Sequence, residues 1–473
     1  MEHSFVDRER ERQFLETLAS RKGAQLVVVY GRRRAGKTML TSRFVSEKKG
    51  IYYLCSKGGE KEQLELLSFR LADHFRDEGL RSRPIQNWGQ FFDYLATRAA
   101  SRFFTEFDEF PFLIEANPAV PSIFQKYWDE KLSKTQVYMI LCGSSIGMME
   151  SKVLGYRSPL YGRRSGQWKL EPLEFRHVAE FFPAKTPFER IMEIYAVAGG
   201  MPFYLRSMDG DKTALENIME SVASKGMPLS EEGEYLVREE LPEPATYFSI
   251  LHAIASGKTR QNEIADHAGM KATAITRYLA NLIRLRLIER TAPITEKIKS
   301  KKALYVISDN FLRFWFTFIY PNKSYLEEEN YQKLRELISA GFNAFVGRAF
   351  EGVCMQFLCR LKSKGGISFD RAGRWWGAKR TESGERETAE IDIVLLEGDF
   401  KIILCECKWK NNVNAAEIAK TIEGKAELVM WNAALRKDEY LIFAKSFSKK
   451  ITEFNGRKTR CYDIQDMEKM LRD

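Results

Sequence analysis

The stretch from residue 24 to residue 45 constrains the fold more than any other part of the chain. It begins with an apolar run from Leu26 to Tyr30, continues through the loop GRRRAGKT and ends in a helical pattern. The loop matches G-x-x-x-x-G-K-[ST] in the strand, loop and helix setting that this pattern requires. Its glycines let backbone N–H groups and the helix start face a phosphate. The sequence therefore predicts an α/β fold with a parallel sheet and a phosphate-binding loop in its first third.

Two side chains of this loop are expected to contact the phosphates or the metal ion of a bound nucleotide. Lys37 is expected to reach the β and γ phosphates of ATP, and Thr38 is expected to hold Mg²⁺. A glycine turn with an unrelated lysine is the alternative, but the flanking strand and helix make chance a poor explanation. The residues expected to bind the nucleotide are Gly31, Arg34, Ala35, Gly36, Lys37, Thr38 and Met39.

An acidic pair is expected at the end of another strand, where it would hold the metal and polarise the attacking water. The stretch FFTEFDEF supplies it, with Asp108 as the metal-side carboxylate and Glu109 as the base. Thr105 and Glu106 interrupt what is usually a continuous apolar run in a parallel strand. Nucleotide binding is therefore better supported by this stretch than nucleotide turnover.

Polar residues after the next apolar run are further candidates. VYMILCGSS ends in Ser144 and Ser145, which could sense the γ-phosphate or simply form a serine-rich turn. Beyond it, SPLYGRRSG offers Arg163 and Arg164 on an expected loop. Arg163 is a candidate arginine finger or sensor, although a solvated basic turn would have the same sequence.

Several of these motifs occur together and in a fixed order, namely FVDRERE, GRRRAGKT, DEFPFLIEANPAVPSIFQKYWDE, CGSSIGMME, SPLYGRR and AVAGGMPFYL. In this order they resemble the archaeal-type ATPase family, a branch of the P-loop AAA+/STAND group. The resemblance implies an ATP site that includes Asp108, Glu109 and Arg163 beside the phosphate-binding loop. It also implies that GGMP, residues 199–202, belongs to a helical lid.

The stretch from residue 241 to residue 308 changes to short helices followed by a hairpin. Helices are expected at 244–256 and 261–270, and a third from 271 to 290, before a lysine-rich wing. This order favours a winged helix, which the family resemblance also implies. Such a domain binds DNA in some proteins and serves as a spacer or docking module in others. The side chains offered to DNA would be Lys271, Thr273, Thr276, Arg277, Lys299, Lys301 and Lys302.

The stretch AEIDIVLLEGDFKIILCECKWK, residues 389–410, predicts two strands and a tight turn. The period of two places Asp392 on one face of the first strand, and Glu406 and Lys408 on one face of the second. Two carboxylates that hold Mg²⁺ and a lysine that stabilises charge are what metal-dependent phosphodiester cleavage requires. Solvated charges on an ordinary hairpin are the alternative.

With a glutamate on the preceding helix, this hairpin resembles the PD-(D/E)xK nuclease fold. The resemblance implies Glu351, Asp392, Glu406 and Lys408 as catalytic residues, Asp392 and Glu406 as metal ligands, and Glu390 as an auxiliary group. Trp375, Trp376 and Trp409 could line a nucleic-acid groove or belong to a core.

Length and composition indicate how many domains contain these motifs and whether disulfides stabilise them. At 473 residues the chain is expected to contain about two to four domains. The predicted domains are a P-loop ATPase (1–180), a helical lid (181–240), a winged helix (241–320) and an α/β nuclease-like domain (321–473). Seven irregularly spaced cysteines do not suggest a disulfide framework, and Cys405 and Cys407 are expected to pack in a core.

Charge and hydropathy bear on partners. The net charge of +10 permits binding to DNA, and no apolar run is long enough to cross a membrane, so a cytoplasmic protein is expected. The function predicted is nucleotide-controlled DNA binding and cleavage with ATP and Mg²⁺, in a possible homo-oligomer. An ATP-driven STAND-type switch with a non-cleaving C-terminal domain, or a transcriptional regulator, are the alternatives.

Overall fold

The structure is a computed structural model that describes residues 6–297, 300, 302–380 and 386–472. The chain divides into two compact units. The first comprises residues 1–173 with 201–203, and the second comprises residues 174–200 with 204–473.

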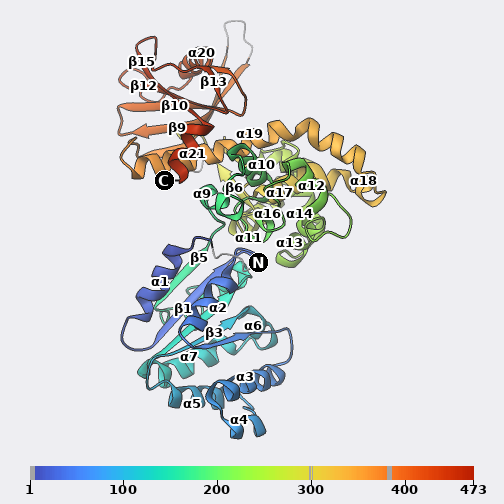
Figure 1. Cartoon of the computed structure of the whole chain (residues 1–473), viewed down its shortest axis with the longest axis vertical. Coiled ribbons are helices and arrows are strands. Elements are labelled where there is room, and N and C mark those ends of the chain that lie inside the picture. The colour runs from blue at the N-terminus through green and yellow to red at the C-terminus, as the bar shows by residue number, and fades with distance from the viewer. Residues whose placement is uncertain (1–5, 298–299, 301, 381–385, 473) are drawn as a thin grey trace. The chain divides into compact units, whose positions relative to one another are not determined.

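The first unit is built on a five-stranded sheet in which all neighbouring strands run parallel, in the order β2-β3-β4-β1-β5 (Figure 1). Every residue of β1, β3 and β4 is buried, as expected for strands covered by helices on both faces. This topology confirms the predicted P-loop α/β fold. The strands are β1 (Gln25–Gly31), β2 (Ile51–Leu54), β3 (Phe103–Asp108), β4 (Val137–Gly143) and β5 (Gly166–Leu170).

The helices of this unit bury apolar stripes against the sheet and against one another. The rings of Trp88, Phe107 and Phe124 meet in mostly edge-to-face contacts, with centroids 5.2 to 6.3 Å apart. The helices are α1 (Glu9–Ala19), α2 (Lys37–Glu47), α3 (Glu60–Phe75), α4 (Glu78–Ser82), α5 (Trp88–Arg98), α6 (Pro111–Ala116), α7 (Val120–Glu130) and α8 (Ile146–Met148).

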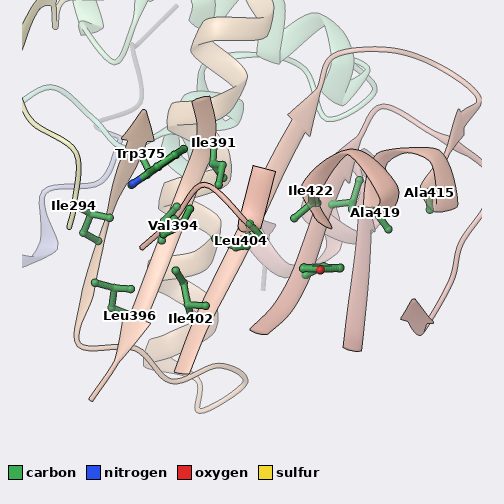
Figure 2. Packing of buried hydrophobic residues seen from close by; sticks show 14 residues of the cluster. Ile294, Trp375, Ile391, Val394, Leu396, Ile402, Leu404, Ala415, Ala419 and Ile422 are labelled. Carbon is green, nitrogen blue, oxygen red and sulfur yellow. The ribbon is translucent and has the colours of Figure 1, made fainter. Parts of the chain in front are cut away.

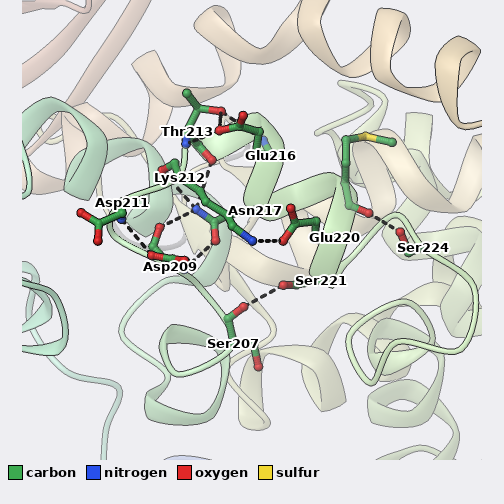
Figure 3. A network of polar contacts seen from close by, with 11 residues as sticks. Ser207, Asp209, Asp211, Lys212, Thr213, Glu216, Asn217, Glu220, Ser221 and Ser224 are labelled. Carbon is green, nitrogen blue, oxygen red and sulfur yellow. Dashed lines mark hydrogen bonds and ion pairs between the residues drawn. The ribbon is translucent and has the colours of Figure 1, made fainter.

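The second unit begins with short helices, of which α12 shows why they form where they do. Thr213 and Glu216 make a reciprocal capping box at its start, and the amide of Asn217 bridges the backbone of Asp209 in both directions (Figure 3). The helices of this region are α9 (Phe175–Val178), α10 (Phe188–Ala198), α11 (Pro202–Leu205, which crosses between the two units), α12 (Ala214–Ser221) and α13 (Glu232–Glu240).

Three helices and a two-stranded hairpin follow: α14 (Pro244–Ala255), α15 (Gln261–His267), α16 (Ala272–Arg284), β6 (Ile288–Thr291) and β7 (Leu304–Ile307). The first two helices lie where the sequence predicts them. The third was expected to continue to residue 290, and this is wrong. It ends at Arg284 because Arg286 adopts a left-handed conformation with φ of 57°, after which Ile288 starts a strand antiparallel to β7.

A dense aromatic segment connects this region to the C-terminal part. Its helices are α17 (Asn310–Phe314), a π-helical turn (Trp315–Ile319), α18 (Lys323–Glu327) and the long α19 (Tyr331–Ser363). Phe311, Phe314 and Trp315 are fully buried, and the Trp315 indole donates to the carbonyl of Ser230 at 2.9 Å. These aromatic side chains therefore belong to a core.

The C-terminal sheet is mixed, with the order β14-β15-β12-β10-β9-β8. β10 runs antiparallel to β9 and parallel to β12, so the predicted hairpin lies in the middle of the sheet. The elements are β8 (Arg371–Arg380), β9 (Arg386–Glu397), β10 (Lys401–Lys408), α20 (Ala415–Ala426), β12 (Lys437–Ala444), β14 (Glu453–Phe454), β15 (Arg457–Asp463) and α21 (Ile464–Arg472), with a small pair of β11 (Val413–Asn414) and β13 (Phe447–Lys449).

Helix α20 covers one face of the hairpin. Val394 pairs with Leu404, and their side chains share a buried cluster with Ala419 and Ile422 of α20 (Figure 2). Ile294, from the loop between β6 and β7, joins the same cluster. No helix in the described ranges combines the length and hydropathy of a membrane span.

Leu404→Ala is expected to destabilise the C-terminal sheet by about 2–5 kcal/mol, because it leaves a cavity in a fully buried cluster. Hydrogen exchange of the β10 amides measures the effect. Leu435→Ala, at a position 88% exposed, is the control and is expected to change stability by less than about 0.5 kcal/mol. Equal effects of the two substitutions would contradict the packing described.

Candidate functional site

The phosphate-binding loop is shaped by its two glycines. A Cβ on Gly31 would lie 2.4 Å from the carbonyl oxygen of Leu170, so no larger residue fits there. Gly36 caps α2 with a left-handed φ of 91°, which glycine adopts without strain. The loop therefore leads from the end of β1 to the N-terminus of α2, the position from which helix amides face a phosphate.

Lys37 and Thr38 lie where the sequence predicts them, at the start of α2. Lys37 is buried, and its ammonium donates to the carbonyl of Arg32 at 2.8 Å, within the loop. The Thr38 hydroxyl donates to Oδ2 of Asp108 at 2.7 Å. The two predicted metal-binding side chains are thus in direct contact, and their oxygens are the type of ligand that Mg²⁺ prefers.

Asp108 is fully buried at the end of β3 and is held by three donors. Besides Thr38, these are the Tyr52 hydroxyl at 3.0 Å and the Glu109 amide at 2.9 Å. Burial and the Asp108 charge raise the pKa of Tyr52, so this phenol stays protonated. Sequence reasoning missed Tyr52, because its strand β2 carries no motif of its own.

Glu109 follows directly and is oriented by Ser144. Its backbone has a left-handed φ of 51°, and its Oε2 accepts bonds from the Ser144 hydroxyl at 2.7 Å and the Ser144 amide at 3.1 Å. The serine expected to sense the phosphate therefore holds the predicted base.

Glu106 is the unusual residue of β3. It is fully buried, accepts a hydrogen bond from Thr41, and burial raises its pKa well above its usual value. Within the described ranges, Glu106, Asp108 and Cys142 are the one group of three potential ligands whose donor atoms all lie within 4.8 Å of one another. The interruption seen in the sequence thus lies directly beside the predicted metal ligand.

Arg8 and the segment 201–203, which begins within the GGMP stretch, contact the loop. The buried guanidinium of Arg8, from the FVDRERE motif, donates to the Ala35 carbonyl at 3.0 Å. Arg34 stacks over the ring of Phe203 at 4.1 Å, so the segment 201–203 lies against the loop. The resemblance to the family pointed to both motifs, but no argument from the residues had assigned Arg8 a contact.

Arg163 lies on the surface in a fork-like pair with Asp129, with nitrogen to oxygen distances of 2.8 to 3.2 Å. It also donates to the carbonyls of Pro159 and Tyr161. Its pKa is raised by the bond to Asp129. Its role toward a phosphate stays a prediction.

The C-terminal hairpin brings Asp392, Glu406 and Lys408 together. Ile393 pairs with Cys405 across the strands, so Asp392 and Glu406 are the next residues along β9 and β10. Asp392 Oδ2 accepts the Cys407 amide at 2.8 Å, and the Lys408 ammonium lies 3.8 Å from that oxygen while donating to Glu406 Oε2. Although burial alone would lower it, the neighbouring Glu406 raises the pKa of Lys408.

Glu351 reaches this region from α19 but has a different partner. Its carboxylate lies 3.3 Å from the Arg374 guanidinium of β8, and Glu390 lies 3.9 Å from the same group. In the part of the chain that the structure describes, Glu351 does not join Asp392 and Glu406 in a group with all ligand atoms within 4.8 Å. Asp392 and Glu406 supply carboxylate oxygens, the type of ligand that Mg²⁺ takes, whereas Glu351 is paired with Arg374.

Several side chains considered for nucleic-acid contact are buried or hydrogen-bonded within the protein. Trp375 and Trp409 are buried, and the Trp376 indole donates to the carbonyl of Lys302 at 3.1 Å. The backbone of Ile294 also bonds to β8, through the carbonyl of Arg374 at 2.9 Å. Ile294 and Lys302, on the segment between β6 and β7, thus contact β8, the edge strand of the C-terminal sheet. Lys299 and Lys301 lie outside the described residues.

Comparison with known proteins shows the family of the chain. A family described as an ATPase domain predominantly from Archaea matches residues 5–208, and one described as archaeal and bacterial proteins of unknown function matches residues 315–421. An uncharacterized protein of Methanocaldococcus jannaschii is 36% identical over 475 residues, covering 98% of this chain and 99% of that protein. The chain belongs to this archaeal ATPase family.

Further similarities of this archaeal ATPase are shorter or more distant. A protein of Methanocaldococcus jannaschii named as ATP-binding is 49% identical over 45 residues, which is 10% of this chain and 76% of that protein. The Walker-type ATPase of Pyrococcus abyssi superposes with a TM-score of 0.48 at 22% identity, covering 66% of this chain and 96% of that one. The ORC2 protein of Aeropyrum pernix has a TM-score of 0.41 at 12% identity, covering 72% and 98%.

The titration of Glu351 provides a test of the C-terminal geometry. Burial raises its pKa from 4.5 to about 7, so the folded state keeps a proton that the unfolded state releases between these values. Stability is therefore expected to fall as pH rises through that window, by on the order of 3 kcal/mol in total. Glu351→Gln should remove this part of the pH dependence in urea unfolding with a chelator present. A profile unchanged by the substitution would contradict the burial of Glu351.

Proposed function

We propose that the protein is an ATP hydrolase whose nucleotide state controls metal-dependent cleavage of DNA by its C-terminal domain. The observation that carries the cleavage half is the convergence of Asp392, Glu406 and Lys408 on the β9–β10 hairpin. In this proposal the domains are a P-loop ATPase at 1–180, a lid at 181–240, a winged helix at 241–320 and a nuclease-like domain at 321–473.

The ATPase half of the proposal rests on the groups around the phosphate loop. Lys37 neutralises charge on the β and γ phosphates, and Thr38 and Asp108 hold Mg²⁺. Glu109, fixed by two bonds from Ser144, accepts a proton from the water that attacks the γ-phosphate. The predicted base is thus already oriented by the protein.

The cleavage half assigns each C-terminal group a task. Asp392 and Glu406 hold a Mg²⁺ ion, which when bound lowers the pKa of a water and so supplies a nucleophile. Lys408 stabilises negative charge that develops on the phosphate. An ammonium that already lies between the two carboxylates can do this without a large movement.

DNA binding is assigned to the start of α16. Lys271, Thr273, Thr276 and Arg277 are exposed there, in the place that a recognition helix presents to a groove. Lys302 is also exposed and remains available to a phosphate, although its ammonium is paired with Glu296. Arg163 would act on ATP of a neighbouring copy in a homo-oligomer, because its side chain lies at the surface on Asp129.

A switch without cleavage is the second candidate function. One observation favours it: both oxygens of the buried Glu406 already have lysine partners, so the carboxylate is satisfied without an ion. In this alternative, ATP changes the assembly of the protein while DNA or a protein binds the C-terminal domain intact.

Lys37→Ala is expected to abolish ATP binding and hydrolysis, because it removes the lysine that the motif places at the β and γ phosphates. Glu109→Gln should keep binding but lower kcat by about 100-fold or more, because the base is lost while its hydrogen bonds to Ser144 are kept. Phosphate release and fluorescent-nucleotide binding measure the two effects. Undiminished turnover in Glu109→Gln would exclude Glu109 as the base.

Cleavage is tested by incubating the purified protein with circular and branched DNA and Mg²⁺ or Mn²⁺. The wild type should cleave, and Asp392→Ala should lose at least about 100-fold in rate, because one metal ligand is gone. Asp399→Ala, at an exposed position in the turn of the same hairpin, is the matched control and should retain activity. No cleavage by the wild type, together with a nucleotide-dependent change in particle mass by light scattering, would favour the switch.

A further inference from the structure

Glu406 has a second lysine partner that does not belong to the E-x-K pattern. Lys425, near the end of α20, places its ammonium 2.6 Å from Oε1 of Glu406, while Lys408 donates to Oε2. The Glu406 side chain has no exposed surface. Each oxygen of this buried carboxylate therefore has an ammonium of its own.

The position of Lys425 in the chain explains how it comes to lie there. The face of α20 formed by Ala415, Ala419, Ile422 and Ala426 is buried, and Lys425 lies at the edge of that face. An ammonium in the last turn of a helix is also favoured by the helix dipole. Its side chain remains 21% exposed, so the ammonium lies between the buried Glu406 and solvent.

The formal charges of the four side chains Asp392, Glu406, Lys408 and Lys425 sum to zero. Asp392 and Glu406 supply two negative charges, and Lys408 and Lys425 supply two positive ones. A divalent ion added to this group leaves two positive charges uncompensated. A phosphodiester, whose charge grows during attack, is the kind of ligand that such an excess attracts.

We infer that Lys425 is a further residue of the C-terminal site, with two tasks. It competes with a divalent ion for Oε1 of Glu406, and its ammonium binds a phosphate oxygen of the nucleic acid when it is not on that carboxylate. This inference rests on the proposed nuclease function. Lys408 differs from it because Lys408 is shared between Asp392 and Glu406, whereas Lys425 pairs with Glu406.

The two tasks predict effects of opposite sign for Lys425→Met in the full-length protein. Mn²⁺ binding measured by calorimetry without nucleotide should become about tenfold tighter, because a positive charge beside the ligand oxygen is removed. DNA cleavage at saturating Mn²⁺ should become about tenfold slower or more, because a cation for the phosphate is lost. The part of the Mn²⁺ binding heat that is present in the wild type and absent in Asp392→Asn is assigned to this site.

Lys420→Met is the matched control, because Lys420 is exposed on the same helix. It should change neither Mn²⁺ binding nor cleavage. Lys425→Gln, which keeps a hydrogen-bond donor to Glu406 but no charge, should behave like Lys425→Met and serves if the methionine variant does not fold.

A lysine that only stabilises the fold gives a different result. Weaker Mn²⁺ binding together with slower cleavage, or no change in either, would overturn the inference. If the wild type does not cleave DNA, the proposed function fails. The calorimetric measurement of Mn²⁺ binding then still tests whether Lys425 competes with the ion. Tighter Mn²⁺ binding in Lys425→Met then supports competition at Glu406, and unchanged binding overturns it.

Discussion

A carboxylate removed from water must be compensated by cations or hydrogen-bond donors, and both candidate sites of this protein are organised by that constraint. Asp108 is held by Thr38, Tyr52 and the amide of Glu109. Glu406 is held by Lys408 and Lys425. In each case at least one of these groups comes from another element of the fold, which is α2 for Thr38, β2 for Tyr52 and α20 for Lys425. Folding of the sheet and assembly of the site are therefore one event.

The two sites differ in how their carboxylates are compensated, and this suggests different responses to an ion. The hydrogen-bond donors to the Asp108 carboxylate are neutral groups, namely two hydroxyls and a backbone amide. Glu406 is surrounded by ammonium groups, which an ion must displace or share. At the C-terminal site, the binding of a metal ion and of a phosphate would therefore depend on where Lys408 and Lys425 lie.

Much of this arrangement could be predicted from the sequence because the relevant residues are close along the chain. The phosphate loop, the strand that ends at Asp108 and the hairpin with Asp392, Glu406 and Lys408 all have short-range patterns of glycine, apolar and charged residues. Parallel strands bring their carboxyl ends to one edge of a sheet, which explains why Thr38 and Asp108 meet. The predicted end of α16 was wrong, because the left-handed conformation of Arg286 cannot be recognised in the hydrophobic periodicity of the sequence.

Contacts between distant elements could not be predicted. From the sequence, Lys425 is one of several cations on a helix surface, and only the fold shows that it pairs with Glu406. Likewise, Tyr52 is one of several aromatic residues in strands, and only the fold shows that it bonds to Asp108. The packing of the β6–β7 loop on β8 likewise depends on how residue 294 meets the cluster around Trp375. Arg8 lies in the motif FVDRERE, but only the structure shows its bond to the carbonyl of Ala35. The most direct test of nucleotide control is the rate of Mn²⁺-dependent DNA cleavage with and without ATP, in the wild type and in Lys37→Ala. The account predicts that ATP changes the rate for the wild type alone, and equal rates in all four conditions would contradict it.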